Sequence, residues 1–189
     1  MNMDELARRV KDSSIRLAAA TTEVKNKALE FIAASLTERK NEIIKANRLD
    51  LDRSEKENLS APLLKRLNFD EEKIADVVDG IHDLIKLEDP VGKTLLSTEL
   101  DEGLELYKVT SPIGVIGVIF ESRPDALVQI ATLCLKSGNG VLLKGGSEAM
   151  ETNRILAEVI LDATMKAGIP EYWAALLETR SDVNDMLKM

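Results

Sequence analysis

The sequence predicts an α/β fold, in which an N-terminal helical region is followed by the strand, helix, strand and helix of a parallel sheet. Apolar residues recur at three- and four-residue spacing, with charges between them, from the start of the chain to about Asp89. After Pro90, two apolar runs, GVIGVIF at 114–120 and GVLL at 140–143, are typical of strands buried on both faces. A helical pattern follows each run, and this order favours a right-handed βαβα unit.

The first region, residues 1–90, has only helical patterns. Met3 to about Asn47 predicts two long helices that break near Thr21, and ANRLDLD continues the second pattern. A short helix is expected at Ala61–Leu67, and Asp70 is a natural N-cap for a longer helix after it. We interpret the charged runs here as solvated helix faces.

The second region, residues 91–110, loses the helical period and gains threonine and serine. LELYKV alternates as an edge strand or a hairpin arm does. We interpret Thr94–Val109 as an extended hairpin that bridges the regions on either side.

The third region, residues 111–189, holds the predicted βαβα unit. Its first helix follows Arg123-Pro124 and ends at Gly138, in the C-terminal glycine position. Its second helix is expected to begin with Ser147 as N-cap and to carry Glu148 and Glu151 in the first turn.

Composition and charge exclude several classes of function. The net charge of −8 is spread along the chain, which argues against nucleic acid as a partner. No stretch reaches the ~20 apolar residues that span a bilayer, and the start has no signal core, so we expect a cytoplasmic protein with no membrane partner. One cysteine, Cys134, excludes an internal disulfide, and with His82 as the one histidine a Cys/His metal site is not expected. We interpret His82 as structural or merely exposed.

A parallel βαβ unit binds ligands at the carboxyl ends of its strands. The turns at Phe120–Pro124 and Lys144–Glu148 occupy these positions. They are therefore the candidate functional segments of the chain.

The second turn reads Lys144-Gly145-Gly146-Ser147. The glycines remove side-chain bulk, the lysine offers a long cationic donor, and the serine opens a helix whose N-terminus favours anions. These features suit a ribose or its phosphate. The segment lacks both the Walker spacing and the G-x-G-x-x-G fingerprint, however, and a glycine pair after a strand can be only a tight turn.

The segment SPIGVIGVIFESRPDALVQIATLCLKSGNGVLLKGGSEAMETNRIL closely resembles the gamma-glutamyl phosphate reductases, also called glutamate-5-semialdehyde dehydrogenases, of proline biosynthesis. Upstream, KNKALEFIAASL, ANRLDLD, LSAPLLKRL and DPVG resemble the same family. The resemblance covers nearly the whole chain. ESRP, CLKSGN and LLKGGSEA separate this family from other aldehyde dehydrogenases.

The resemblance implies an aldehyde-dehydrogenase-like fold, with a Rossmann-type cofactor domain, a catalytic domain with a cysteine nucleophile, and a flap that forms homo-oligomers. In the family's reaction, NADPH reduces the small-molecule substrate gamma-glutamyl phosphate to glutamate 5-semialdehyde, and phosphate leaves. A cysteine thiolate displaces the phosphate, and the resulting thioester accepts hydride.

The family's nucleophilic cysteine lies far downstream of LLKGGSEA, beyond Met189. Cys134 falls on the apolar face of a predicted helix, which fits a packing thiol. We therefore expect no catalytic residue in this chain, no catalytic domain and an incomplete Rossmann sheet. Such a fragment, taken alone, should be inactive.

For the cofactor, Lys144 matches the lysine that reaches the adenosine ribose hydroxyls in aldehyde dehydrogenases. Ser147 stands where NAD-preferring relatives place a glutamate against the ribose 2′-hydroxyl. A small hydroxyl leaves room for a 2′-phosphate and avoids like-charge repulsion, although Glu148 is only one position later. The hypothesis is that Lys144 and Ser147 hold the 2′-phosphate end of NADPH.

At the other turn, aldehyde dehydrogenases carry an asparagine whose amide donates to the developing oxyanion. Ser122 occupies that position here, so the role does not transfer directly. Arg123 could contact the phosphate or carboxylate of the substrate, or it could form a salt bridge that supports the turn. The same two alternatives apply to Glu121.

Two other functions stay open at the level of sequence. The chain could be part of another NAD(P)-dependent aldehyde dehydrogenase with a different substrate. It could also act without catalysis, as a helical interaction module or as a partner for a second chain.

Overall fold

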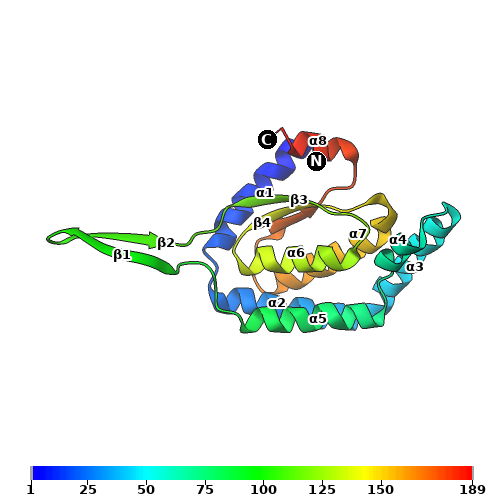
Figure 1. Ribbon diagram of the computed structural model, residues 1–189, viewed down its shortest axis with the longest axis horizontal. Helices are drawn as coiled ribbons and strands as arrows, with labels where there is room; N and C mark the ends of the chain where they lie inside the picture. Colours follow the sequence, from blue (N-terminus) through cyan, green and yellow to red (C-terminus); the bar gives the residue numbers. More distant parts are fainter. Residues whose placement is uncertain (1, 189) are drawn as a thin grey trace.

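The computed structural model describes residues 2–188, which form a layered α/β body with one projecting hairpin (Figure 1). Five helices come first: α1 (Met3–Ala18), α2 (Thr22–Glu38), α3 (Lys40–Lys56), α4 (Ala61–Leu67) and α5 (Glu71–Lys86). The hairpin is β1 (Thr94–Asp101) and β2 (Leu104–Val109). The remaining elements are β3 (Val115–Ile119), α6 (Pro124–Lys136), β4 (Gly140–Lys144), η1 (Ser147–Ala149), α7 (Met150–Lys166), η2 (Glu171–Trp173), β5 (Ala174–Leu176) and α8 (Arg180–Met186).

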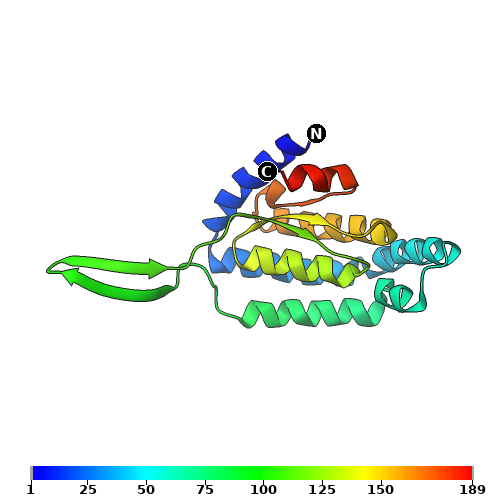
Figure 2. The same ribbon diagram turned by 45° about the horizontal axis from the view of Figure 1, so that its top comes forward.

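The strands β3, β4 and β5 form a parallel sheet in that order, connected by α6 and α7. Helices α6 and α7 cover one face of the sheet, and α2 and α5 pack outside them. Helix α1 covers the other face, where it also contacts α8 (Figure 2). The predicted α/β class with a parallel sheet is therefore confirmed. Because α1 and α2 pack directly against this unit, the division at residues 90 and 110 stays a prediction.

The main core lies between the sheet and the inner helices. It joins α2 and α5 to α6, α7 and the central strand β4, and includes Trp173, whose indole N–H donates to Thr164 at 2.9 Å. A smaller apolar cluster on the opposite face contains Val10 of α1 and Leu142 of β4. Burial on both faces explains why β4 is an unbroken apolar run up to Lys144.

The N-terminal helices confirm part of the predicted pattern. Thr21 caps α2 by accepting from the Val24 N–H at 3.4 Å, and Asp70 caps α5 by accepting from Lys73 at 3.1 Å. The prediction of two long helices was wrong, because the chain turns again at Arg39 and α3 begins. The guanidinium of Arg39 bonds Glu42 and reaches Glu158 of α7 at 2.7 Å, so tertiary contacts stabilise this turn.

The hairpin prediction is confirmed at the predicted residues, Thr94–Val109. The expectation that the run at 114–120 is buried on both faces was wrong. Within residues 2–188, β3 pairs with β4 on one side only, Ile119 is 55% exposed and Gly117 is exposed. The β-branched residues of β3 favour a strand, as predicted, but at the edge of the sheet they are only partly buried.

Two buried lysines hold together the end of the body from which the hairpin leaves. Lys25 of α2 pairs with Asp89 at 2.5 Å. Lys136 of α6 donates to Asn26 at 2.8 Å and to the Ile85 carbonyl at 3.3 Å. Burial lowers the pKa of Lys136. The contacts tie α2, α5 and α6 to the segment that precedes β1.

The start of α7 corrects another prediction. Ser147 does not cap this helix, because Ser147–Ala149 forms a separate turn of 3-10 helix and α7 begins at Met150. The cap comes from α3, where the Asp50 carboxylate accepts from the N–H groups of Glu151 at 3.2 Å and Thr152 at 2.8 Å. It also accepts a hydrogen bond from the Thr152 hydroxyl at 2.7 Å. A carboxylate from a distant helix therefore occupies the role expected of a local serine.

Arg53 completes this network. Its guanidinium pairs with Asp50 at 2.6 Å and donates to the carbonyls of Ser147 and Glu148 at 3.1 Å each. Asp50 is fully buried. The turn between β4 and α7 is thus fixed by side chains of α3.

We expect Asp50→Ala to lower the free energy of unfolding by about 3 kcal/mol, because it leaves buried N–H groups of α7 without their acceptor and Arg53 without its ion-pair partner. Urea denaturation measures this loss. Asp52→Ala, at an exposed position of the same helix, is the matched control and should change stability by less than about 0.5 kcal/mol. Equal effects of the two substitutions would contradict the assigned role of Asp50.

Candidate functional site

A cleft of about 710 Å³ opens at the carboxyl ends of the parallel strands. Open α/β sheets bind ligands at this edge, so its position agrees with the sequence-based prediction. The lining comes from the segments that follow each strand, together with residues around α4 and in α8. These residues are Leu59, Leu63, Ile119, Phe120, Glu121, Ser122, Lys144, Gly145, Gly146, Ser147, Glu148, Glu178, Val183 and Asn184.

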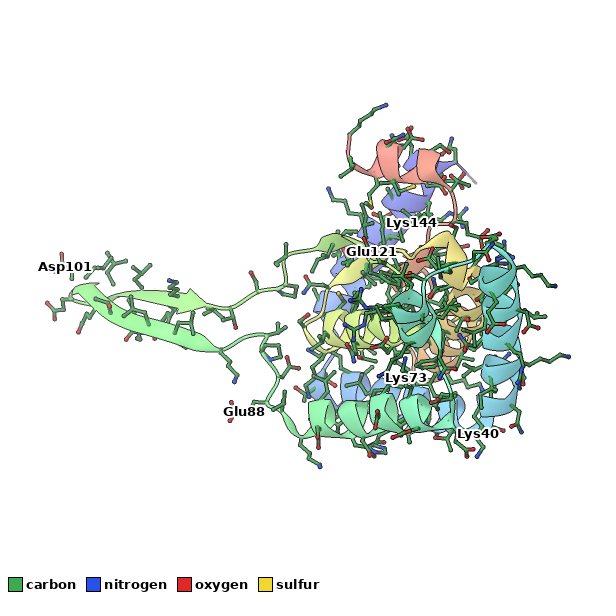
Figure 3. The ribbon with its side chains drawn as sticks, turned by 45° about the vertical axis from the view of Figure 1, so that its right-hand side comes forward. Lys40, Lys73, Glu88, Asp101, Glu121 and Lys144 are labelled. Carbon is green, nitrogen blue, oxygen red and sulfur yellow. The ribbon has the colours of Figure 1, made fainter. Side chains whose placement is uncertain are left out.

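The two predicted turns meet across this cleft. The Phe120 N–H donates to the Lys144 carbonyl at 3.0 Å, which extends the pairing of β3 with β4. The Ser122 hydroxyl donates to the Glu148 carboxylate. Figure 3 shows Glu121 and Lys144 near each other at the upper end of the body. Parallel pairing therefore brings together segments that are more than 20 residues apart in sequence.

The glycine pair is required by packing at one position. Gly145 is buried, and an added Cβ would overlap the Asn153 amide of α7 and lie 3.1 Å from Phe120 Cε2. At Gly146 an added Cβ would meet only the end of the Glu148 side chain. Neither glycine has a positive φ. Close approach of the strand end to α7, and not an unusual backbone conformation, is therefore what requires glycine at 145.

Lys144 and Ser147 both face the cleft. The Lys144 ammonium folds back to donate to the Gly145 carbonyl at 2.5 Å. Ser147 is exposed, and its hydroxyl forms no hydrogen bond with another described residue. The cation and the hydroxyl that the sequence singled out are thus both available to a ligand in the same turn.

Two of the three carboxylates of the cleft, those of Glu148 and Glu178, have partners of their own. Arg154 forks onto Glu178 with contacts of 2.6 and 2.8 Å, and this hydrogen bonding lowers the pKa of Glu178. Glu148 is bound by Ser122, whereas Glu121 is exposed. Lys144 is the cationic side chain among the lining residues. An anionic ligand would therefore depend on Lys144 and on the backbone N–H groups of its turn.

Arg123 does not line this cleft. Its guanidinium pairs with Asp125 at 2.7 Å, and this hydrogen bond raises the pKa of Arg123. Of the two alternatives for Arg123, the structure shows the salt bridge that supports the turn. Contact of Arg123 with a substrate stays a prediction. Ser122 lies at the cleft but is 5% exposed, with its hydroxyl already engaged by Glu148.

Cys134 lies on the buried face of α6 and does not line the cleft. It is 7% exposed, and burial raises the pKa of its thiol to about 11. The thiol is therefore protonated at neutral pH and a poor nucleophile. His82 is exposed on α5. Among residues 2–188 no group of three or more His, Cys, Asp or Glu side chains is arranged to hold a metal ion.

The sequence analysis missed the contribution of α8. Val183 and Asn184 of this helix line the cleft, and Thr179 and Asp182 form a capping box at its start. The T-x-x-D spacing at Thr179 was a readable signal for this helix.

None of the described helices is both long and apolar enough to cross a bilayer.

Comparison with known proteins supports the family resemblance. A gamma-glutamyl phosphate reductase of Acetivibrio thermocellus is 74% identical over 189 residues, which is 100% of this chain and 44% of that protein. The crystal structure of gamma-glutamyl phosphate reductase from Thermotoga maritima superposes with a TM-score of 0.95 and 37% identity, over 99% of this chain and 46% of that one. The chain matches the gamma-glutamyl phosphate reductases along its whole length.

The match spans less than half of those reductases. A crystal structure of an acetylating aldehyde dehydrogenase from Geobacillus thermoglucosidasius shares 17% identity at a TM-score of 0.70, over 98% of this chain and 39% of that chain. That likeness confirms the aldehyde-dehydrogenase-like fold and no more. No protein-family model matches the chain.

We expect Gly145→Ala to destabilise the protein by about 1–3 kcal/mol, because the added Cβ overlaps Asn153 in a closely packed site. Gly146→Ala is the matched control and should cost less, since the Glu148 side chain can move away at the loss of its hydrogen bond with Ser122. Urea denaturation compares the two. Adding Asn153→Ala to Gly145→Ala should recover part of the loss, and no recovery would argue against this packing explanation.

Proposed function

We propose that this chain forms the cofactor-binding and scaffold part of a cytoplasmic, NADPH-dependent oxidoreductase of proline biosynthesis. The reaction is the reduction of gamma-glutamyl phosphate to glutamate 5-semialdehyde, with release of phosphate. The proposal rests on the cleft that joins the turns at Ser122 and Lys144, in a chain 74% identical to a gamma-glutamyl phosphate reductase.

The residues of the cleft fit a dinucleotide. Lys144 would hold the ribose hydroxyls and the 2′-phosphate, and the small hydroxyl of Ser147 would add a donor without a like charge. Gly145 and Gly146 line the cleft, and their missing side chains make room for Asn153 and Glu148 beside it. The Glu148 carboxylate is held by Ser122, which limits its repulsion of the phosphate.

The chain's own residues bind and orient; they do not supply the nucleophile. The proposed chemistry needs a thiolate that displaces phosphate to form a thioester, which hydride from NADPH then reduces. Cys134 cannot serve, because its thiol is buried and protonated at neutral pH. Ser122, at the edge of the cleft, holds the Glu148 carboxylate in position by donating a hydrogen bond to it.

We expect the chain to bind NADPH more tightly than NADH, with Lys144→Ala lowering NADPH affinity about tenfold through loss of a charged hydrogen bond. Ser147→Glu should lower NADPH affinity and affect NADH less, because only NADPH carries the 2′-phosphate. Quenching of nucleotide fluorescence measures both affinities. Lys166→Ala, at an exposed lysine near the far end of α7, is the control. Equal affinity for the two nucleotides in every variant would contradict the assignment.

We expect the isolated chain to show no oxidation of NADPH in the presence of gamma-glutamyl phosphate, because its one cysteine is not in the cleft. Absorbance at the NADPH band follows the reaction. Turnover above the rate without protein that persists in Cys134→Ala would reveal a nucleophile other than cysteine. Turnover that is lost in Cys134→Ala would make Cys134 the nucleophile. Both results would contradict the proposal.

The hairpin β1–β2 supports a homo-oligomer as a further part of the proposal. Every residue of both strands is exposed, and the hairpin projects away from the body (Figure 1). A two-stranded hairpin alone is marginally stable in water, and its apolar side chains favour a second surface. These side chains are Leu95, Leu96, Leu100, Leu104, Leu106, Tyr107 and Val109.

We expect the double substitution Leu104→Ser and Leu106→Ser to lower the mass of the particle in solution, because it removes apolar contacts between copies. Sedimentation velocity measures the mass. Thr98→Ser, at a polar position of the same hairpin, should leave the mass unchanged. A wild-type chain that is already a monomer at all concentrations would refute this role of the hairpin.

A further inference from the structure

A second hollow, of about 620 Å³, lies beside the candidate cofactor cleft and has a different charge. It is lined by Pro62, Lys65, Arg66, Lys73, Arg123 and Asp125. Four of these side chains are cationic and one is anionic, in a chain with 33 acidic and 25 basic residues. The local charge is therefore opposite to that of the protein as a whole.

Two of the cations are held in place by the fold. Lys73 of α5 donates to the carbonyls of Lys65 at 3.2 Å, Arg66 at 3.3 Å and Asn68, where α4 ends. These three bonds use all the N–H groups of its ammonium, so Lys73 contributes positive charge to the hollow but no free donor. Arg123 pairs with Asp125, whose side chain is 14% exposed, while the guanidinium stays 57% exposed. Such anchoring lowers the conformational entropy that ligand binding would cost.

The other two cations have no such partner. Lys65 and Arg66 are exposed, and no carboxylate of residues 2–188 lies within salt-bridge distance of either. Both project from α4, a helix of only seven residues. After the pairing of Arg123 with Asp125, three positive charges remain around the hollow.

The hollow and the cleft adjoin each other through two pairs of sequence neighbours. Leu63 lines the cleft and Pro62 lines the hollow, and Ser122 lines the cleft while Arg123 lines the hollow. In Figure 3, α4 lies between Lys73 and the pair Glu121 and Lys144. A ligand in the hollow would therefore lie beside the Ser122–Arg123 segment, the other side of which borders the cofactor cleft.

We propose that Lys65, Arg66 and Arg123 form a phosphoryl-binding subsite, distinct from the cofactor cleft, with the fixed charge of Lys73 beside them. A local charge of about three favours a dianion such as a phosphate group over a single carboxylate, and guanidinium forks match its oxygens. This subsite rests on the proposed function for its ligand, the acyl phosphate substrate. It would hold the phosphoryl group of the acyl phosphate until the C–O bond to the acyl carbon breaks, and then the inorganic phosphate that leaves.

The test is a titration of the 15N-labelled chain with inorganic phosphate at constant ionic strength, followed by amide chemical shifts. The expected shifts fall in residues 62–73 and 123–125. The double variant Lys65→Ala and Arg66→Ala should weaken phosphate affinity at least tenfold. The side chains of both residues are exposed and form no salt bridge within residues 2–188, and circular dichroism verifies the fold. Lys45→Ala, at another exposed helical lysine, should bind phosphate as the parent chain does.

Three outcomes would overturn the subsite. Shifts confined to residues 144–148 and lost in Lys144→Ala would place the phosphate in the cofactor cleft. Binding unchanged in the double variant, or stronger binding of glutamate than of phosphate, would show that the hollow does not select a phosphoryl group. The NADPH titration fails or succeeds independently of this experiment, because it reports on Lys144 and Ser147.

Discussion

The buried carboxylate of Asp50 is the interaction on which the geometry of the cleft depends. Asp50 belongs to α3, and its carboxylate caps α7 by accepting from the first N–H groups of that helix. The two helices are about a hundred residues apart in sequence. Arg53 extends the same network to the carbonyls of Ser147 and Glu148. The turn after β4 is therefore positioned from outside the βαβ unit to which it belongs.

This arrangement changes the electrostatics of the turn. A free helix N-terminus offers positive potential to an anion, but here Asp50 already uses the first N–H groups of α7. The turn presents instead a short 3-10 segment, the Lys144 ammonium and the Ser147 hydroxyl. A nucleotide in this cleft would consequently be recognised through side chains more than through a helix dipole, which makes the identity of residue 147 important for the choice between cofactors.

The cleft and the neighbouring hollow at the edge of the sheet are lined by side chains of opposite charge. The cleft carries Glu121, Glu148 and Glu178 around one lysine, whereas the neighbouring hollow carries four cations around Asp125. Short segments separate the two, so a cofactor and an anionic substrate could approach the same turn from opposite sides. The α4 helix, which the sequence marked only as a short helical segment, borders both hollows.

Local chemistry in the sequence determined most of the elements. Helical spacing, the Asp70 cap, Gly138 at the end of α6 and the alternation of LELYKV depend on interactions within a few residues, and the structure has them where the sequence placed them. The meeting of the Ser122 and Lys144 turns was also predictable, because the carboxyl ends of parallel strands share one edge. Tertiary structure alone decided that β3 is an edge strand, that Asp50 replaces Ser147 as the cap of α7, and that Arg123 faces a different hollow from Ser122. Each of these depends on partners distant in sequence, and no local pattern records which distant side chain will reach a helix end or cover a strand.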